Sequence, residues 1–307
     1  MFVVCALGWA ATLLLGNALV VLAVEICCTA VRRIRNGLIL GRMRGKWAVV
    51  TGCTDGIGLS MARELARCKV NLILVSRSPE KLEALRQDLS KEVEAKVIPI
   101  DFEQEVDFRS ALEPARECSP CLLVNNVGVN EAGPTAFAEH TEKSIHRILQ
   151  VNIVNTIGIT KEFLAWGASP AGKRYILSTG SMLGIMPSPF QQVYAGSKAF
   201  LQAWMDSVAS EPTDCHCEVL MTGLVCSKLS GAKKPNLFTP SAELYGQNCI
   251  HSFGTGHVTY PYFPHFILSM FLRVLPGSLV GAAMRRVGEA VRAMKRRKSE
   301  AAAKKKE

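Results

Sequence analysis

A glycine-rich segment between an apolar run and a helical pattern most constrains the fold of this chain. Trp47–Val50 has the pattern of a buried strand, and Thr51–Gly58 (TGCTDGIG) follows it directly. A helix through Met61, Leu65 and Ala66 is expected next. Glycines in such a unit allow a tight turn and the close approach of a pyrophosphate, which the N–H groups of the helix N-terminus attract. The glycine spacing differs from G-x-G-x-x-G, and no Lys follows as in a P-loop.

The alternation of apolar runs and helical patterns continues along the chain. Further strands are expected at Val70–Ser76, Lys96–Ile100, Cys121–Asn125, Arg174–Ser178 and Glu218–Met221. Strands that alternate with helices form a parallel sheet with right-handed crossovers and helices on both faces. The sequence therefore predicts an α/β fold, a doubly wound parallel sheet of the Rossmann-like type.

The end of the second expected strand indicates which nucleotide such a fold would bind. An acid at this position would hold the ribose hydroxyls of NAD, but the chain has Ser76-Arg77-Ser78. A guanidinium suits the 2′-phosphate of NADP. The alternative is that Arg77 only caps a surface turn. Asp101 follows the third strand and is expected to meet the adenine ring.

Tyr194 and Lys198 share one face of a helix if the segment around them is helical. An ammonium near a phenol lowers the phenol pKa from its ordinary value of about 10, which makes Tyr194 a candidate proton donor or acceptor. Ser181 is far enough back to come from the end of the preceding strand. The alternative is a chance pair on a solvated helix face. Asn152, a polar residue in an apolar helical run, is either solvated or functional.

The N-terminus has the pattern of a membrane anchor. Residues 2–24 carry no charge, and as a helix they would extend about 35 Å, enough to cross a bilayer. A cleaved signal peptide is the alternative, but the basic n-region and the shorter apolar core of such a peptide are missing. Basic residues between 32 and 46 follow the apolar stretch and predict that the rest of the chain lies in the cytosol. The eleven cysteines show no disulfide-framework spacing, which suits a reducing compartment.

Composition divides the chain into five expected segments. They are a transmembrane anchor at 1–30, a basic juxtamembrane linker at 31–45, an NADPH-binding catalytic domain at 46–257, an apolar segment at 258–284 and a basic tail at 285–307. Prolines interrupt 258–284, which favours a membrane-surface or re-entrant segment over a spanning helix, with packing onto the body as the alternative. Most of the net charge of +10 lies at the two ends, so a nucleic-acid surface is not expected.

These motifs together resemble those of the short-chain dehydrogenase/reductase family. The matching residues are Thr51-Gly52-x-x-x-Gly56-Ile57-Gly58, Asn125-Asn126-Val127-Gly128, Asn152, Ser181 and Tyr194-x-x-x-Lys198, within about 46–228. The chain is similar to the membrane-bound branch of 17-beta-hydroxysteroid dehydrogenases and very-long-chain 3-oxoacyl-CoA reductases. The N-terminal anchor, Asp101-Phe102 and Lys233-Lys234-Pro235 suggest that branch. The sequence departs from the family pattern at Val127, at Thr222-Gly223 and at Ser227, where a Thr is common.

The resemblance implies a catalytic set of Asn152, Ser181, Tyr194 and Lys198. Tyr194 would give its proton to the developing alkoxide and Ser181 would orient the same oxygen. Lys198 would lower the Tyr194 pKa and hold the nicotinamide ribose, and Asn152 would hold a proton-relaying water. The implied cofactor-binding residues are Gly52, Thr54, Asp55, Gly56, Ile57, Gly58, Ser76, Arg77, Asp101, Asn125, Asn126, Gly128, Tyr194, Lys198 and Ser227, and no metal is expected.

The resemblance favours NADPH-dependent reduction of a 3-oxoacyl-CoA in microsomal fatty-acid elongation, with Lys233 and Lys234 near CoA phosphates. The alternatives are a 17-beta-hydroxysteroid dehydrogenase, or another steroid dehydrogenase, and a catalytically idle membrane scaffold. Expected partners are a long-chain acyl-CoA or steroid, membrane lipid, other elongation enzymes and a second copy in a homodimer, with no nucleic acid. Lys304-Lys305-Lys306-Glu307 resembles a dilysine signal for the endoplasmic reticulum membrane. The chain-length preference stays open.

Overall fold

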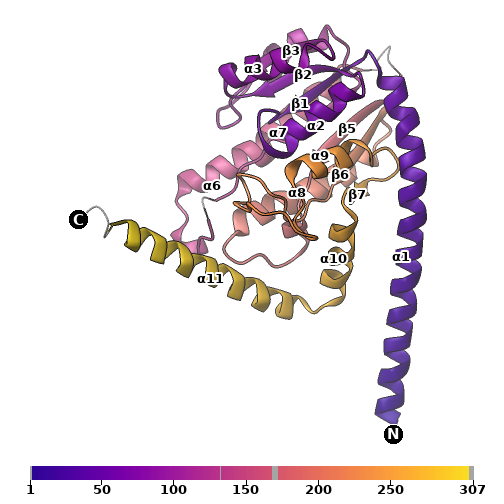
Figure 1. Cartoon of the computed structure of the whole chain (residues 1–307), viewed down its shortest axis with the longest axis vertical. Coiled ribbons are helices and arrows are strands. Elements are labelled where there is room, and N and C mark those ends of the chain that lie inside the picture. The colour runs from indigo at the N-terminus through magenta and orange to yellow at the C-terminus, as the bar shows by residue number, and fades with distance from the viewer. Residues whose placement is uncertain (1, 132, 168–171, 304–307) are drawn as a thin grey trace.

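The computed structural model describes residues 2–131, 133–167 and 172–303, without the side chains of 2–15, 17, 18 and 298–303. Its strands are β1 (Trp47–Thr51), β2 (Asn71–Ser76), β3 (Ala95–Pro99), β4 (Leu122–Asn125), β5 (Arg174–Thr179), β6 (Cys215–Leu220) and β7 (Val258–Thr259). Within the described chain they form one parallel sheet in the order β3-β2-β1-β4-β5-β6-β7 (Figure 1). The order reverses between β1 and β4, and in such sheets ligands bind beyond the carboxyl ends of the strands at this point.

Helices connect the strands and cover both faces of the sheet. They are α1 (Phe2–Met43), α2 (Gly56–Arg67), α3 (Pro79–Leu89), α4 (Phe108–Ala111), α5 (Glu113–Arg116), α6 (Glu142–Leu149), α7 (Asn155–Ala165), α8 (Gln192–Ala209), α9 (Ala242–Ile250), α10 (Phe263–Val274) and α11 (Gly277–Ala303). The described residues also include two 3₁₀ turns, η1 (Phe137–Glu139) and η3 (Met182–Ile185), and a π-helical turn, η2 (Gln150–Val154). The expected doubly wound α/β fold is confirmed.

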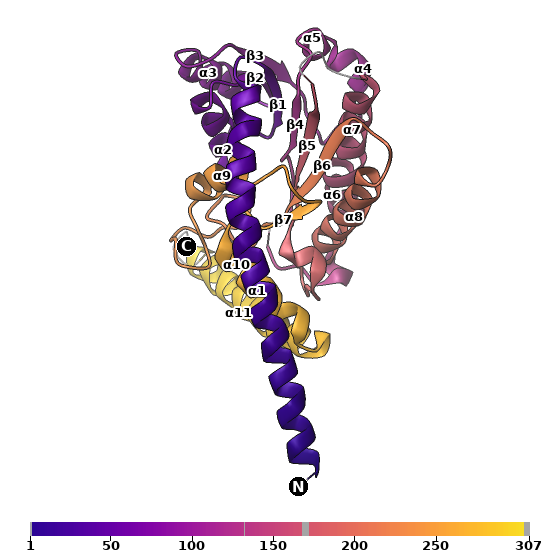
Figure 2. The same ribbon diagram turned by 90° about the vertical axis from the view of Figure 1, so that its right-hand side faces the viewer.

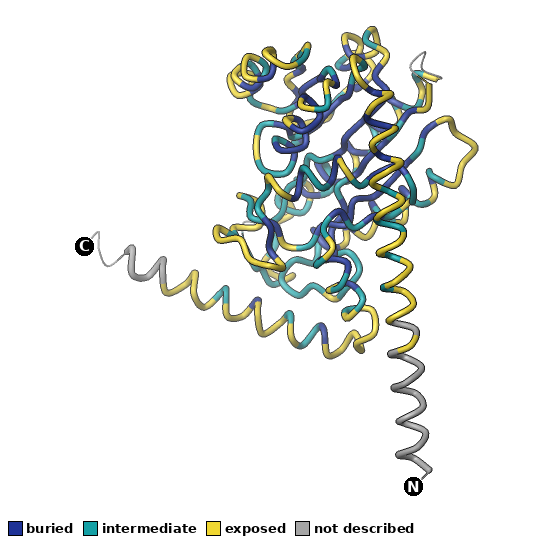
Figure 3. The backbone as a smooth tube through the Cα atoms, turned by 45° about the vertical axis from the view of Figure 1, so that its right-hand side comes forward, coloured by how far each residue is buried: buried dark blue, intermediate teal, exposed yellow. Residues whose placement is uncertain are grey.

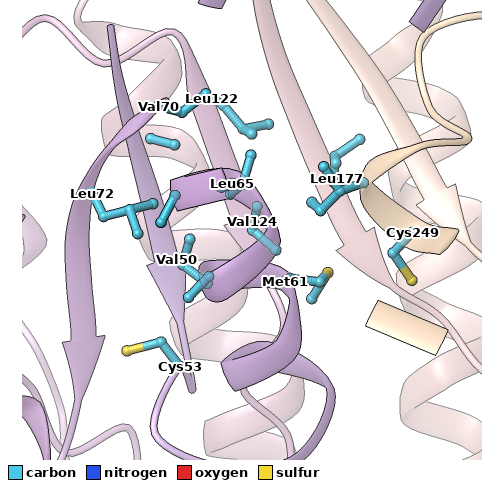
Figure 4. Packing of buried hydrophobic residues seen from close by; sticks show 14 of the residues in the cluster. Val50, Cys53, Met61, Leu65, Val70, Leu72, Leu122, Val124, Leu177 and Cys249 are labelled. Atoms are coloured by element: carbon cyan, nitrogen blue, oxygen red, sulfur yellow. The ribbon is translucent and has the colours of Figure 1, made fainter. Parts of the chain in front are cut away.

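Alternating apolar residues in each strand build one core on each face of the sheet. In β1, Val50 points to the core under α2, α3 and α9, while its neighbour Val49 points to the core under α4, α7 and α8. Figure 4 shows Val50 with Met61 and Leu65 of α2 in the first core. The two helical layers appear on opposite sides of the sheet in Figure 2. Strands buried on both faces have continuous apolar runs, which is why they were readable in the sequence.

Helix α1 differs from the expected division into anchor and linker. It continues without a break through the segment expected as a linker and ends at Met43. Ile39, Leu40 and Met43 enter the core beside α9, and the Asn36 side chain donates a hydrogen bond of 3.1 Å to the Phe253 carbonyl. The helix persists because these buried contacts support its last turns. Its N-terminal half extends past the body (Figures 1 and 2).

The predicted membrane anchor lies largely outside the described side chains, at residues 2–15, 17 and 18. In the part of the chain whose side chains are described, no helix is both long enough and apolar enough to cross a membrane. Residues 304–307, which carry the dilysine pattern, are also outside the description.

The segment 258–284 contributes to the body more than its sequence predicts. It begins with β7, which pairs with β6, and its helix α10 buries His265, Phe266 and Ser269. The two-residue strand β7 was missed because so short an apolar run carries no periodicity. Exposed residues concentrate instead along α1 and α11 (Figure 3).

The contact of Asn36 with Phe253 predicts how firmly α1 is held to the body. Asn36 is 1% exposed, so Asn36→Ala leaves the Phe253 carbonyl buried without its partner. We expect the free energy of unfolding to fall by about 1–3 kcal/mol, measured by urea denaturation of the detergent-solubilised chain. Leu38→Ala is the control on the same helix, because Leu38 is 63% exposed. Equal effects of the two variants would contradict the prediction.

Candidate active site

The glycine-rich loop between β1 and α2 adopts a backbone that only glycine accommodates well. Gly52 and Gly56 have φ angles of +63° and +56°, in the left-handed region. A Cβ on Gly58 would lie 2.3 Å from both the Gly52 carbonyl oxygen and Asn126 Nδ2. The loop therefore passes close to β4, and its turn leaves the N-terminus of α2 accessible for an anionic group.

Asn126 holds this loop to the ends of the neighbouring strands. Its Nδ2 donates to the carbonyl oxygens of Thr51 and Gly52 at 3.1 and 3.2 Å, and its Oδ1 accepts from Thr179 Oγ1 at 3.4 Å. The Thr51 hydroxyl accepts from the backbone N–H groups of Asn126 and Val127. The carboxyl ends of β1, β4 and β5 are thus linked by side-chain hydrogen bonds at the switch point of the sheet.

Asn125 has a different position from the one expected. It is 4% exposed, and its Nδ2 donates to Thr160 Oγ1 at 2.8 Å and to Ser178 Oγ at 3.4 Å. Its side chain therefore ties β4 to α7 and β5 instead of facing the glycine-rich loop. The physical reason is the alternation of a strand, which turns successive side chains to opposite faces.

Polar groups at the ends of β2 and β3 adjoin the same loop. Thr54 Oγ1 and Ser76 Oγ lie 3.0 Å apart. The Arg77 side chain is 68% exposed and forms an ion pair of 3.2 Å with Glu103. Asp101 accepts a hydrogen bond from the backbone N–H of Glu103, which fixes the turn after β3. An exposed guanidinium with one surface partner can exchange that partner for a phosphate at low cost.

The loop after β6 reaches the start of α2. Asp55 caps α2 by accepting from the Gly56 N–H at 2.8 Å, and it pairs with Lys228 at 2.6 Å. The hydrogen bond from Lys228 is the main cause of a lowered Asp55 pKa. Ser227 approaches within 3.7 Å of the position that a Cβ on Gly56 would occupy. Ile57 packs partly buried against the core, so its side chain supports the loop.

Contacts from α9 and α10 fix the loop at Thr222-Gly223, where Thr222 replaces the Pro that is usual in the family. A Cβ on Gly223 would lie 2.7 Å from the His265 ring, whose Nδ1 accepts from the Gly223 N–H at 3.1 Å. The Thr222 hydroxyl accepts from the Tyr245 hydroxyl at 3.0 Å. Helices α9 and α10 therefore hold this loop in place.

Helix α8 brings Tyr194 and Lys198 to the end of β5. Both residues are buried, at 8% and 6% exposed. Lys198 Nζ donates to the Thr179 carbonyl at 2.7 Å and lies 5.8 Å from the centre of the Tyr194 ring. Ser181 is the N-cap of η3, just after β5, and forms a hydrogen bond with Tyr194. The three side chains expected to act on a substrate thus converge.

Burial dominates the electrostatics of this group and corrects one expectation. Burial raises the pKa of Tyr194 to about 12, although the hydrogen bond with Ser181 lowers it, and the charge of Glu131 adds to the increase. Burial also lowers the pKa of Lys198 to about 8. The prediction that Lys198 lowers the Tyr194 pKa below its ordinary value is therefore wrong for this arrangement. Desolvation disfavours the charged form of both groups more than their proximity favours it.

Asn152 lies in the π-helical turn η2 and clamps the loop after β4. Its Oδ1 accepts from the Val129 N–H and its Nδ2 donates to the Val129 carbonyl, both at 2.9 Å. Nδ2 also donates to Ser197 Oγ at 3.0 Å. A Cβ on Gly128 would lie 3.5 Å from Asn152 Oδ1 and 3.7 Å from Lys198 Nζ, so Gly128 lies next to both side chains. The extra residue of the π turn orients the Asn152 side chain toward this loop.

Helix α11 lies against the segment between Ser181 and Tyr194. Gly288 packs so closely on the Phe190 ring that a Cβ would lie 2.3 Å from it. The Arg292 guanidinium stacks 5.1 Å from the same ring and pairs with Glu139 of η1 at 2.6 Å. The C-terminal helix therefore joins the two loops that flank Tyr194.

Several groups of this site were not predicted from the sequence. Thr179 and Ser197 contact Lys198 and Asn152, Lys228 pairs with Asp55, and Glu131 influences Tyr194. Thr179 could have been found as the last residue of a strand at the carboxyl edge of the sheet. The other three are defined only by contacts between distant segments.

Residues 46–236 match the family model described as short chain dehydrogenase, and the chain belongs to that family. A relative from Schizosaccharomyces pombe (strain 972), named very-long-chain 3-oxoacyl-CoA reductase, is 33% identical over 81% of this chain and 78% of its own length. A relative of the same name from Aspergillus terreus (strain NIH 2624) is 31% identical over 84% of this chain and 77% of its own length.

Solved structures share the fold. A 7beta-hydroxysteroid dehydrogenase superposes with a TM-score of 0.66 at 19% identity, covering 80% of this chain and 98% of that one. The 3-oxoacyl (acyl-carrier-protein) reductase of Agrobacterium tumefaciens C58 with NADP bound superposes with a TM-score of 0.64 at 19% identity, covering 73% and 94%. At this identity the likeness establishes the Rossmann-like architecture alone.

The tight packing around Gly58 predicts a specific loss of cofactor binding. In Gly58→Ala the new methyl group must displace Gly52 or Asn126, which deforms the loop. We expect the Kd for NADPH to rise about tenfold or more, measured by fluorescence titration. Gly41→Ala in α1 is the control, because a Cβ there has no atom within 4 Å. Wild-type affinity in Gly58→Ala would contradict this assignment of the loop.

Proposed function

We propose that this protein reduces a long-chain 3-oxoacyl-CoA to the 3-hydroxyacyl-CoA with NADPH, as a step of fatty-acid elongation. The observation that carries the proposal is the convergence of Ser181, Tyr194 and Lys198 beside the glycine-rich loop. The relatives named very-long-chain 3-oxoacyl-CoA reductase, matched over most of the chain, support the substrate class.

The loop geometry fits a dinucleotide. The left-handed turns at Gly52 and Gly56, with the loop packed tightly on Gly58, shape the backbone at the start of α2 for a pyrophosphate. Thr54, Ser76 and the exposed Arg77 would hold the 2′-phosphate of NADPH. Ser227, beside Gly56, and Lys198 would hold the nicotinamide half. When bound, NADPH supplies the hydride that reduces the carbonyl carbon.

The side chains of the site supply the proton and hold the substrate oxygen. Tyr194 donates its phenolic proton to that oxygen as negative charge develops there. Its raised pKa keeps the proton in place until the substrate arrives. Ser181 hydrogen-bonds the same oxygen and orients it. Protonated Lys198 stabilises the phenolate that remains, and Asn152 keeps the adjoining loop in register through Val129.

The loop between β6 and α9 supports an acyl-CoA substrate. It exposes Leu224, Leu229, Leu237 and Phe238, which are between 46% and 66% exposed, and Lys228 of the same loop pairs with Asp55 at the start of α2. Lys233 and Lys234 lie exposed in the same loop. Apolar side chains suit a long acyl chain, and the two lysines suit the phosphates of CoA.

The same proposal includes attachment to the endoplasmic reticulum membrane with the catalytic domain in the cytosol. The apolar N-terminal stretch and the basic residues after it support this orientation. Phe271, Val274, Leu275 and Leu279, at the junction of α10 and α11, are between 48% and 67% exposed. The α10–α11 junction lies toward the end of the molecule to which α1 extends (Figures 1 and 2), so this junction would rest on the membrane surface.

A direct comparison of substrates tests the function. Purified full-length protein with NADPH should have a higher kcat/KM for a long-chain 3-oxoacyl-CoA than for a 17-oxosteroid, and a higher activity with NADPH than with NADH. Tyr194→Phe should lower kcat about 100-fold or more, because the proton donor is lost. Tyr175→Phe, a half-buried tyrosine of β5, is the matched control. A preference for the steroid would overturn the proposed acyl-CoA substrate. An absence of NADPH oxidation would indicate a catalytically idle membrane scaffold.

The pKa values predict an alkaline limit for ketone reduction. Reduction requires protonated Tyr194 and Lys198, and the lower pKa of the two, about 8 for Lys198, sets the limit. At limiting NADPH, the rate should fall about tenfold per pH unit above that value. Any activity left in Lys198→Arg should lack the decline, because Arg stays protonated. A constant wild-type rate up to pH 10 would contradict the prediction.

A further inference from the structure

A buried carboxylate near Tyr194 lacks hydrogen-bond partners. The Glu131 side chain is 3% exposed, and neither of its oxygens has a partner among the described residues. His140 Nε2 lies 3.7 Å from Glu131 Oε1, within ion-pair distance for a protonated ring but beyond hydrogen-bond distance, and the His140 side chain is 1% exposed. Burying such groups without partners is costly, which points to a ligand group that completes them.

Other buried carboxylates in the described chain are better satisfied. Glu218 Oε2 accepts from the Gly254 N–H at 2.7 Å and contacts His216 at 2.9 Å. Glu64 contacts His251 at 2.7 Å and accepts from Arg67 at 3.0 Å. Glu131 differs because both of its oxygens are left over, so its burial is not explained by the fold alone.

The acceptor atoms left over around Glu131 indicate the chemistry of the missing partner. The Ser144 hydroxyl gives its single proton to the Thr141 carbonyl at 2.9 Å. It can therefore only accept from His140 Nδ1, which lies 3.4 Å away. Both oxygens of Glu131 are acceptors and neither has a hydrogen bond. Two acceptor oxygens on one buried carboxylate require a hydrogen-bond donor.

The loop that carries Glu131 is fixed by the active site itself. The Asn152 side chain hydrogen-bonds both the N–H and the carbonyl of Val129. Asn130 Nδ2 donates to Oε1 of Gln191, the residue just before α8, at 3.2 Å. The adjoining Gln192 presents another buried oxygen without a partner. The charge of Glu131 contributes to the raised pKa of Tyr194, so the carboxylate lies within electrostatic reach of the phenol. Glu131 therefore belongs to the substrate side of the site.

We propose that Glu131, beside His140, forms a substrate-binding subsite that accepts hydrogen bonds from an N–H or O–H group of the substrate. The inference deepens the proposed function and rests on it. In a CoA thioester the donor is an amide N–H of the pantetheine arm, and in another ketone it is a hydroxyl group. The subsite disfavours an anionic group at this position because a carboxylate faces it.

Thioesters with and without the amide test the subsite in the full-length enzyme with NADPH. One is the 3-oxoacyl thioester of N-acetylcysteamine, which retains an amide N–H, and the other is the same 3-oxoacyl thioester of pentanethiol. Glu131→Met removes both acceptor oxygens at similar volume, while Glu131→Gln keeps one. Glu142→Met is the matched control, because Glu142 is exposed at the start of α6.

We expect Glu131→Met to raise KM for the amide thioester about tenfold or more, with little change in kcat. Glu131→Gln should recover part of this loss. The pentanethiol thioester should have the same KM with all variants. Equal effects on both thioesters would assign Glu131 a structural role, and no effect on either would also overturn the subsite.

Failure of the proposed function is recognised separately, in the wild type. If the wild type reduces no thioester but reduces ketosteroids, the same variants are compared on a 17-oxosteroid with and without a hydroxyl group. A KM increase confined to the hydroxylated steroid would support the subsite with a hydroxyl donor. Equal KM values for the two steroids in all variants would overturn the subsite as well.

Discussion

The hydrogen bonds of the Asn126 side chain are the interaction on which the site depends. They connect the carbonyl oxygens of Thr51 and Gly52 to the Thr179 hydroxyl, while the Thr179 carbonyl accepts from Lys198. One continuous network thus runs from the glycine-rich loop through β4 and β5 to the helix that carries Tyr194. Because these bonds are buried or half-buried, losing one leaves backbone carbonyls without partners, so the loop and the catalytic helix keep a fixed relation.

Burial gives the catalytic group its chemical character. Desolvation raises the pKa of Tyr194 and lowers that of Lys198, so the phenol keeps its proton and the ammonium is easily lost. A phenol that holds its proton suits the reduction of a ketone, which consumes one. The same enclosed setting makes the unpartnered oxygens of Glu131 informative, since in exposed positions water would satisfy them.

The sequence predicted the fold and most of the site because both rest on local patterns. The strands are continuous apolar runs, and the glycines of Thr51–Gly58 mark the turn that the backbone angles require. The helix spacing of Tyr194 and Lys198 placed both on α8. The orientation of Asn125, the short strand β7 and the helical continuation of α1 to Met43 were not predictable, because contacts with distant segments decide each of them.

Local sequence patterns suffice for the α/β architecture, the order of the site residues along the chain and the class of reaction they serve. The direction of the Tyr194 pKa shift and the contact of α11 with Phe190 depend on the packed fold. The packed fold also decided the position of Glu131 and His140 near Tyr194. The physical reason is that apolar periodicity and glycine spacing are local properties, whereas desolvation and hydrogen-bond satisfaction depend on which distant segments enclose a group.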